Sequence, residues 1–318
     1  MHKRRLGQTE LEVSEVGFGA WQLGNNDAWG RMTDKQALRL VAAAIDLGCN
    51  LFDTAPNYAF SNSERLLGRA LRGKRDQVVV VSKFGHRAED GSEDFSIEGF
   101  WESLHQSLSR LQTDYLDVLL LHTPPRHLLN GEHRIWEALA EAQTQGKIRY
   151  YGASVDFADQ VKLLLDTSDA QVVEVLFNIL HQDARRSFDQ IGNNDVGVIV
   201  KVPLDSGWLS GKYNASSQFS GVRARWSAAQ ISQRAQAVDQ IQTTLAQEPS
   251  SQGSLPEQAL AYLLSYDEVS AVIPGVRSLE QLKSNIASAG QRLPLGTRHK
   301  LELLWDTLTD NRRSLFPW

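Results

Sequence analysis

Short apolar runs alternate with amphipathic segments along almost the whole chain. The runs are long enough for buried strands, and the segments between them repeat apolar side chains at the spacing of a helix with one buried face. Eight runs predict strands, at residues 13–20, 50–53, 78–83, 116–122, 148–154, 172–178, 196–202 and 269–273. A strand followed by helical sequence, repeated without a linker, predicts an α/β chain that folds as one (β/α)8 barrel domain over residues 1–318.

Helix starts and the remaining segments add detail to this barrel. Residues 1–16 predict a small hairpin that could plug one end, a long polar loop is expected at 205–228, and an extra amphipathic helix is expected at 297–310. Three places have the spacing of a capping box, in which Ser or Thr caps a helix and Gln or Glu reaches back. They are Thr33 with Gln36, Ser61 with Glu64, and Ser278 with Gln281.

Three consecutive predicted strands end in ionisable side chains. These are Asp53, Lys83 and His122, and Tyr58 follows Asp53 in a turn-rich segment. Each has an ordinary structural explanation when taken alone, such as a capping carboxylate or a core histidine. Neighbouring barrel strands end at one mouth, however, so the four side chains can converge there.

Together the four groups suit proton transfer. An ammonium beside a tyrosine favours the phenolate, and a carboxylate can hold that ammonium in place. An imidazole on the other side can orient a substrate oxygen. The set therefore fits proton delivery to a carbonyl or proton removal from an alcohol, and a redox reaction would require a cofactor that supplies hydride.

Composition narrows the function classes. The net charge is −5 and no long basic run is present, which argues against nucleic acid as a partner. Cys49 is the only cysteine, so an internal disulfide is excluded and a small buried side chain is expected there. No metal site is predicted, because the histidines lack ligand spacing. No apolar run reaches membrane-spanning length, and a cytoplasmic protein that acts without a membrane is the expectation.

Common nucleotide-binding and hydrolase motifs are missing from the sequence. Gly17 and Gly19 are followed by Gly24, which does not fit the Rossmann spacing.

Other short segments, in order along nearly the full chain, match a known pattern. They are residues 17–21 (GFGAW), 52–55 (FDTA) with Tyr58, 81–84 (VSKF), 120–122 (LLH), 152–154 (GAS), 203–204 (PL), 210–213 (SGKY) and 273–278 (IPGVRS). Together they resemble the aldo-keto reductase family.

The resemblance implies a barrel that binds NADP(H) and reduces aldehydes or ketones by hydride transfer. It makes Tyr58 the general acid, with Lys83 lowering its pKa, Asp53 pairing with Lys83 and His122 orienting the carbonyl. It places Arg277 at the adenosine 2′-phosphate, which favours NADP over NAD. The cofactor-binding positions that it implies are Gly19, Ala20, Trp21, Asp53, Ser154, Glu174, Lys201, Pro203, Leu204, Ser206, Gly207, Leu209, Lys212, Gly275, Arg277, Gln281 and Asn285.

Three positions depart from the family pattern where the nicotinamide would rest. Val155 replaces an asparagine, Glu174 replaces a glutamine, and Lys201 stands where an aromatic residue usually stacks on the ring. We hypothesise that Glu174 and Lys201 form an ion pair beside the nicotinamide. Two other functions stay open, namely a sugar or alcohol dehydrogenase that runs the reaction backwards and a non-catalytic NADP-binding regulatory barrel.

The loops that would set substrate choice are rich in aromatic residues. They predict an apolar-walled pocket for a small carbonyl or alcohol substrate. Phe219, Trp226 and the tail at 316–318 are candidates for that wall, or for packing of the loop and tail. The residues expected to face the substrate are Trp21, Tyr58, His122 and Trp208.

Overall fold

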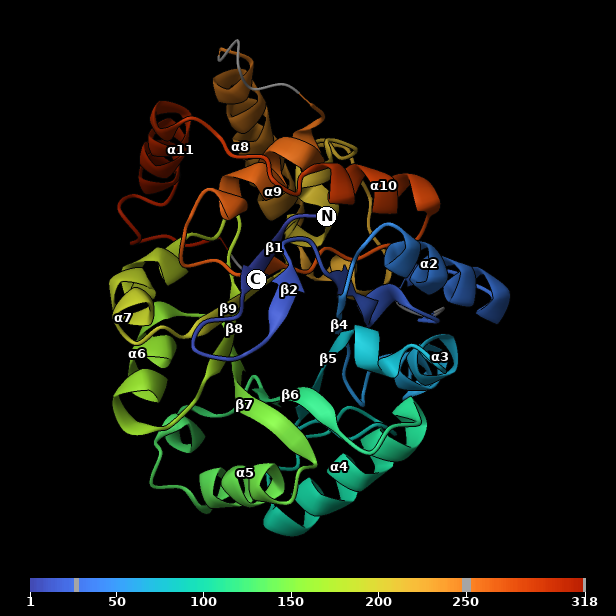
Figure 1. The fold of residues 1–318 in the computed structure, drawn as a ribbon. Helices are drawn as coiled ribbons and strands as arrows, with labels where there is room; N and C mark the ends of the chain where they lie inside the picture. Colours follow the sequence, from blue (N-terminus) through green and yellow to red (C-terminus); the bar gives the residue numbers. More distant parts are fainter. Residues whose placement is uncertain (26–28, 248–252, 317–318) are drawn as a thin grey trace.

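Eight parallel strands form the central sheet of the protein (Figure 1). The structure, a computed structural model, describes residues 1–25, 29–247 and 253–316. Isolated parallel bridges from Val16 to Val272 and from Gly19 to Gly275 join the two edges of the sheet, so it closes as the predicted (β/α)8 barrel. The strands are β3 (Phe18–Gly19), β4 (Leu51–Asp53), β5 (Val79–Phe84), β6 (Leu116–His122), β7 (Ile148–Val155), β8 (Val172–Leu176), β9 (Gly197–Lys201) and β10 (Ala271–Val272).

Helices surround the sheet, and two extra helices lie against each other outside it (Figure 1). The extra pair is α8 (Ala228–Ala246), which follows the loop after β9, and α11 (Leu295–Leu308). The surrounding helices are α2 (Asp34–Asp46), α3 (Asn62–Ala70), α4 (Ile97–Leu111), α5 (Arg134–Thr144), α6 (Ala158–Thr167), α7 (Phe188–Asn193), α9 (Leu255–Leu264) and α10 (Leu279–Ala287). Short 3-10 turns are η1 (Ala20–Gln22), η2 (Arg75–Gln77), η3 (Arg126–Leu129), η4 (Asp183–Ser187), η5 (Asp205–Ser210) and η6 (Gly221–Arg225).

An antiparallel hairpin covers one end of the barrel, as predicted. It consists of β1 (Lys3–Arg5) and β2 (Glu12–Ser14), and its apolar side chains pack among the inward-facing residues of the barrel strands. The prediction of one strand over 13–20 is wrong in its bounds, since the hairpin takes Glu12–Ser14 and β3 holds only two residues. The predicted single strand is therefore two short strands, β2 in the hairpin and β3 in the barrel sheet.

Two of the three predicted capping boxes need correction. Thr33 caps α2 in a complete box with Gln36. Ser278 caps α10, but the Gln281 side chain accepts from the Arg277 backbone instead of the Ser278 backbone. The prediction at Ser61 is wrong, because this residue has a φ of +65° and makes no side-chain cap. Its intended partner Glu64 is buried and accepts hydrogen bonds from Ser82 and Arg110.

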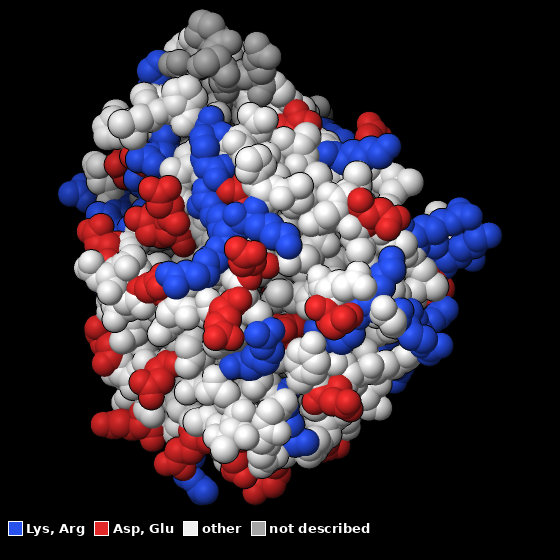
Figure 2. Space-filling view, viewed as in Figure 1, with Lys and Arg blue, Asp and Glu red and all other residues white. Residues whose placement is uncertain are grey.

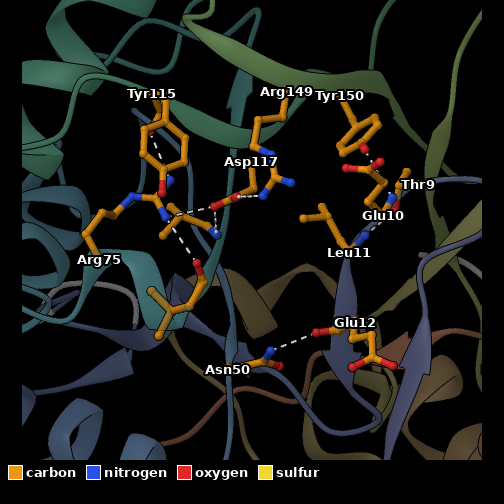
Figure 3. A network of polar contacts seen from close by, with 12 residues as sticks. Thr9, Glu10, Leu11, Glu12, Asn50, Arg75, Tyr115, Asp117, Arg149 and Tyr150 are labelled. Carbon is orange, nitrogen blue, oxygen red and sulfur yellow. Dashed lines mark hydrogen bonds and ion pairs between the residues drawn. The ribbon is translucent and has the colours of Figure 1, made fainter.

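A buried carboxylate holds the strand starts together at the hairpin end (Figure 3). Asp117 on β6 lies 2.8 Å from Arg75 and 3.0 Å from Arg149 and also accepts from the Val80 backbone. Nearby, the Glu10 backbone donates to the Tyr150 hydroxyl. Acidic and basic side chains intermingle over this face (Figure 2). The hairpin end therefore has a structural polar network, away from the strand ends that carry Lys83 and His122.

Cys49 is buried, and burial raises the pKa of its thiol to about 11, as fits a packed side chain rather than a nucleophile. In the described part of the chain, no helix is long and apolar enough to cross a membrane.

Candidate active site

A cavity of about 880 Å³ opens at the C-terminal ends of the strands. It runs from Tyr58 and His122 to the start of α10, and the loop after β9 forms one wall. Five predicted site residues do not line it: Ala20, Lys83, Ser154, Trp208 and Leu209. Those that line it are Gly19, Trp21, Asp53, Tyr58, His122, Glu174, Lys201, Pro203, Leu204, Ser206, Gly207, Lys212, Gly275, Arg277, Gln281 and Asn285.

Lys83 is fully buried behind the cavity wall and is held by two carboxylates. Its Nζ donates to both carboxylate oxygens of Asp53, at 2.7 and 2.6 Å, and to the Thr54 carbonyl. It also lies 3.4 Å from Oε2 of Glu174. Burial alone would lower the pKa of Lys83, but the two carboxylates outweigh it and raise the pKa, so the ammonium stays charged.

Tyr58 lies between this charged pair and an imidazole. The Lys83 ammonium is 5.2 Å from the centre of its ring, and the His122 ring centre is 5.9 Å away in an edge-on arrangement. Burial raises the pKa of the Tyr58 phenol, the Lys83 charge opposes this, and Asp53 adds to the increase. The expected lowering by Lys83 is therefore present but is outweighed, because the phenol loses its solvation.

His122 is a neutral imidazole in this environment. Burial lowers its pKa well below the ordinary value, and the neighbouring Lys83 and His86 lower it further. The His86 ring centre lies 4.9 Å from that of His122. Nδ1 of His122 is buried without a hydrogen-bond partner among the described residues. A buried ring nitrogen without a hydrogen-bond partner is suited to bind a polar group of a ligand in the cavity.

The hypothesis of a direct ion pair between Glu174 and Lys201 is wrong. Lys201 lies 2.9 Å from Asp156, whereas Glu174 is the second carboxylate at Lys83. Ser154 connects the two, because its hydroxyl donates to Glu174 at 2.8 Å and accepts from Lys201 at 3.0 Å. Asp156 also lines the cavity and was not among the predicted site residues, although it follows the fifth predicted strand more closely than Tyr58 follows the second.

The prediction that Trp208 faces the substrate is wrong. Its side chain is fully buried and packs against Tyr213, Phe219 and Trp226 within the loop after β9. The aromatic side chains of this loop mostly pack against one another, although Tyr213 also lines the cavity. The candidate wall residue Trp318 lies outside the described residues.

A buried ion pair anchors the loop after β9. Asp205 begins η5, and Arg234 comes from α8; both side chains are fully buried and their charged atoms are 3.2 Å apart. His181 lies 3.3 Å from the other oxygen of Asp205. Ser206 and Gly207, directly after this anchor, line the cavity. The position of the cavity wall therefore depends on the Asp205 contacts.

Basic side chains line the cavity at the start of α10 and in the loop after β9, together with Glu280 of α10. Arg277, directly before the cap of α10, lines the cavity and donates to the Gly30 and Arg31 carbonyls. Lys212 and Arg223 line the cavity from the loop after β9, and Arg223 also donates to the Tyr213 hydroxyl. Nδ2 of Asn285 is buried without a partner among the described residues. Cations beside a helix N-terminus suit a phosphate-bearing ligand, so the donors present fit a dinucleotide.

A family model for the aldo/keto reductase family matches residues 15–296. The chain belongs to the aldo-keto reductase family. It is 29% identical to the NADH-specific methylglyoxal reductase of Escherichia coli, with 91% of this chain and 93% of that protein covered. It is 30% identical to the L-galactose dehydrogenase of Arabidopsis thaliana, with 92% and 89% covered.

Solved aldo-keto reductases share the fold. The holo form of an aldo-keto reductase from Bacillus halodurans aligns with a TM-score of 0.81 and 28% identity, over 96% of each chain. Family membership makes this aldo-keto reductase one of the oxidoreductases that act on carbonyl compounds with a nicotinamide cofactor.

Proposed function

We propose that this protein reduces an aldehyde or ketone to an alcohol with NADPH. The observation that carries the proposal is the position of Tyr58, which lies between neutral His122 and the Lys83–Asp53 pair at the end of a dinucleotide-sized cavity. No metal participates in the proposed reaction.

The four side chains have separate roles in this reaction. The cofactor, when bound, supplies a hydride to the carbonyl carbon. The carbonyl oxygen takes a proton from the Tyr58 hydroxyl, and the Lys83 ammonium stabilises the phenolate that remains. Asp53 keeps that ammonium in place, and His122 donates a hydrogen bond that orients the substrate oxygen. The products are the alcohol and the oxidised cofactor, and a proton from solvent restores Tyr58.

The cofactor would extend along the cavity from Tyr58 to α10. We infer that Gly19, Trp21, Glu174 and Lys201 surround the nicotinamide, with Ala20 and Ser154 behind them. The pyrophosphate would lie under the loop that holds Ser206, Gly207 and Lys212, which Pro203 and Leu204 begin and Leu209 supports. Gly275, Arg277, Gln281 and Asn285 would bind the adenosine end.

Arg277→Leu is expected to raise the Kd for NADPH about tenfold or more, since a hydrogen bond to a charged group contributes about 1.5–3 kcal/mol. The Kd for NADH should change little, because NADH lacks the 2′-phosphate that the guanidinium would bind. Fluorescence titration with both cofactors measures the two constants.

Arg126→Leu is the matched control, because Arg126 is an exposed arginine, paired with Asp159, that does not line the cavity. Equal weakening of NADPH and NADH binding by Arg277→Leu would contradict the proposed 2′-phosphate contact. An unchanged Kd for both would contradict any cofactor contact of Arg277.

Small oxygen-rich carbonyl compounds are the substrates to test first. One relative is named for the reduction of methylglyoxal, and another is named as a dehydrogenase of the sugar L-galactose. Next to Trp21, Tyr58 and His122, the cavity wall includes Asn57 and Thr123, and Oδ1 of Asn57 is buried without a partner among the described residues. Such a wall suits a substrate with hydroxyl groups near its carbonyl.

The proposed function is tested by turnover. Purified protein is mixed with NADPH or NADH and with methylglyoxal, aromatic aldehydes and aldoses, and the loss of reduced-cofactor absorbance is followed. The reverse reaction is measured with the matching alcohols and both oxidised cofactors. Cofactor binding without turnover of any compound in either direction would favour the regulatory barrel instead.

A further inference from the structure

We propose that Glu174 is a second counter-charge of Lys83 and raises the pH at which Tyr58 ionises, so that the pH ranges of carbonyl reduction and alcohol oxidation both lie higher. This inference rests on the proposed function, because it assigns Tyr58 as the proton donor. It makes Glu174 a positioning residue, since it acts on Tyr58 through Lys83.

The geometry places two carboxylates on one buried ammonium. Nζ of Lys83 lies 2.6 Å from Asp53 and 3.4 Å from Glu174, and the three side chains are 0%, 3% and 2% exposed in the order Lys83, Asp53, Glu174. Charges in a site closed to solvent interact more strongly than they would in water. The Lys83 ammonium thus already interacts with two anions. It therefore stabilises a Tyr58 phenolate less than it would beside Asp53 alone.

Glu174 is itself kept charged. Its Oε1 accepts a hydrogen bond from Ser154, whose hydroxyl accepts from the Lys201 ammonium. Burial would raise the pKa of Glu174, but Lys83 and Lys201 outweigh it and lower the pKa. For Asp53, burial and the neighbouring Glu174 raise the pKa, and Lys83 opposes them. The pKa of Asp53 therefore lies well above its usual value, and Glu174 is the carboxylate of the pair whose charge the surroundings favour.

The surroundings of Tyr58 decide the sign of the effect. Glu174 and Asp53 disfavour the phenolate, and Lys83 favours it. His122 is neutral, and Lys201 is balanced by Asp156 at 2.9 Å. The titratable or charged groups that face Tyr58 or these neighbours are Asp53 on β4, Lys83 on β5, His86 after β5, His122 on β6, Asp156 after β7, Glu174 on β8 and Lys201 on β9.

The consequence concerns the pH dependence of carbonyl reduction and of alcohol oxidation. Reduction requires the Tyr58 hydroxyl as a proton donor, whereas oxidation requires the phenolate as a base. A carboxylate that disfavours the phenolate extends the pH range of reduction upward and delays oxidation to higher pH. Glu174→Gln would keep an acceptor for the Ser154 hydroxyl and remove this charge.

Glu174→Gln tests the proposal. The ionisation of Tyr58 is followed by ultraviolet difference absorbance of the full chain without cofactor, with the trace of the matching Tyr58→Phe variant subtracted. We expect the midpoint to fall by about one pH unit, or about tenfold in the phenolate fraction at fixed pH. The pH profiles of kcat/KM for 4-nitrobenzaldehyde reduction and 4-nitrobenzyl alcohol oxidation should shift in the same direction.

Two further variants keep the test decisive. Lys201→Met removes a cation from the same chain of contacts at a partly exposed position, and the midpoint should move upward instead. Asp117→Asn removes another buried carboxylate, from the hairpin end of the barrel, and should leave the midpoint unchanged even where it lowers stability.

Superimposable titrations of Glu174→Gln and the wild type would overturn the inference, as would shifts of the same sign in Glu174→Gln and Lys201→Met. If Glu174→Gln does not fold, an unshifted midpoint in Lys201→Met overturns it. None of these results would contradict the proposed function, which fails instead if Tyr58→Phe remains fully active.

Discussion

Tyr58→Phe is expected to lower kcat for carbonyl reduction by about 10²–10⁴-fold, the usual contribution of a positioned general acid. The substitution removes only the hydroxyl, and the ring keeps its contacts with Trp21 and His122. NADPH should bind with little change in Kd, because the proposed cofactor contacts lie on other residues. Stopped-flow measurement of hydride transfer and fluorescence titration of NADPH separate the two quantities.

Lys83→Met is the companion variant for this first prediction. It removes the ammonium that would stabilise the phenolate, so it should also lower kcat strongly. Because it leaves Asp53 and Glu174 buried without their cation, it should also lower the free energy of unfolding, which Tyr58→Phe should not. A Tyr58→Phe variant that keeps its wild-type rate would remove Tyr58 as the proton donor.

Asp205→Ala is expected to lower the free energy of unfolding by about 3–5 kcal/mol, the range for breaking a buried ion pair. The change removes a fully buried carboxylate from beside the Arg234 guanidinium and releases the start of the loop after β9. Urea unfolding followed by circular dichroism measures the difference. Cofactor affinity should fall as well, because Ser206 and Gly207 follow this anchor in the cavity wall.

The effect of Asp205 has a defined pH dependence. Burial would raise the pKa of Asp205, but His181 and Arg234 outweigh it and lower the pKa. The ionised carboxylate therefore stabilises the fold above the unfolded pKa, about 3.9, and this stabilisation is lost as the pH falls through the lower folded value. The gap between wild type and variant should narrow at acid pH. Asp159→Ala, at an exposed pair with Arg126, should cost at most about 1 kcal/mol at neutral pH.

The sequence was sufficient where local pattern determines the structure. The run at 116–122 has the same bounds as β6, because a strand buried on both faces of a parallel sheet is mostly apolar, with Asp117 and His122 as its polar exceptions. The convergence of Asp53, Lys83 and His122 followed from the rule that barrel strands end at one mouth. Thr33 caps its helix because its partner is three residues away.

The sequence was insufficient where a side chain meets a partner far along the chain. Glu64 fits a capping box, but Arg110, 46 residues later, binds it in the core. Lys201 pairs with Asp156 because β7 and β9 lie on either side of β8, which no local pattern specifies. Trp208 points into its own loop, and its direction depends on three other aromatic residues that gather there.

The closure of the barrel has a consequence for how the chain folds. The sheet closes through isolated bridges from Val16 and Gly19 to Val272 and Gly275, and Arg4 of the hairpin donates to the carbonyls of Leu264, Tyr266 and Val269. During synthesis on the ribosome, more than 250 further residues must be added after the β3 segment before its second partner, the β10 segment, has been made. Until then both edges of a growing parallel sheet carry unpaired backbone groups, so the nascent chain depends on late closure for protection against association with other chains.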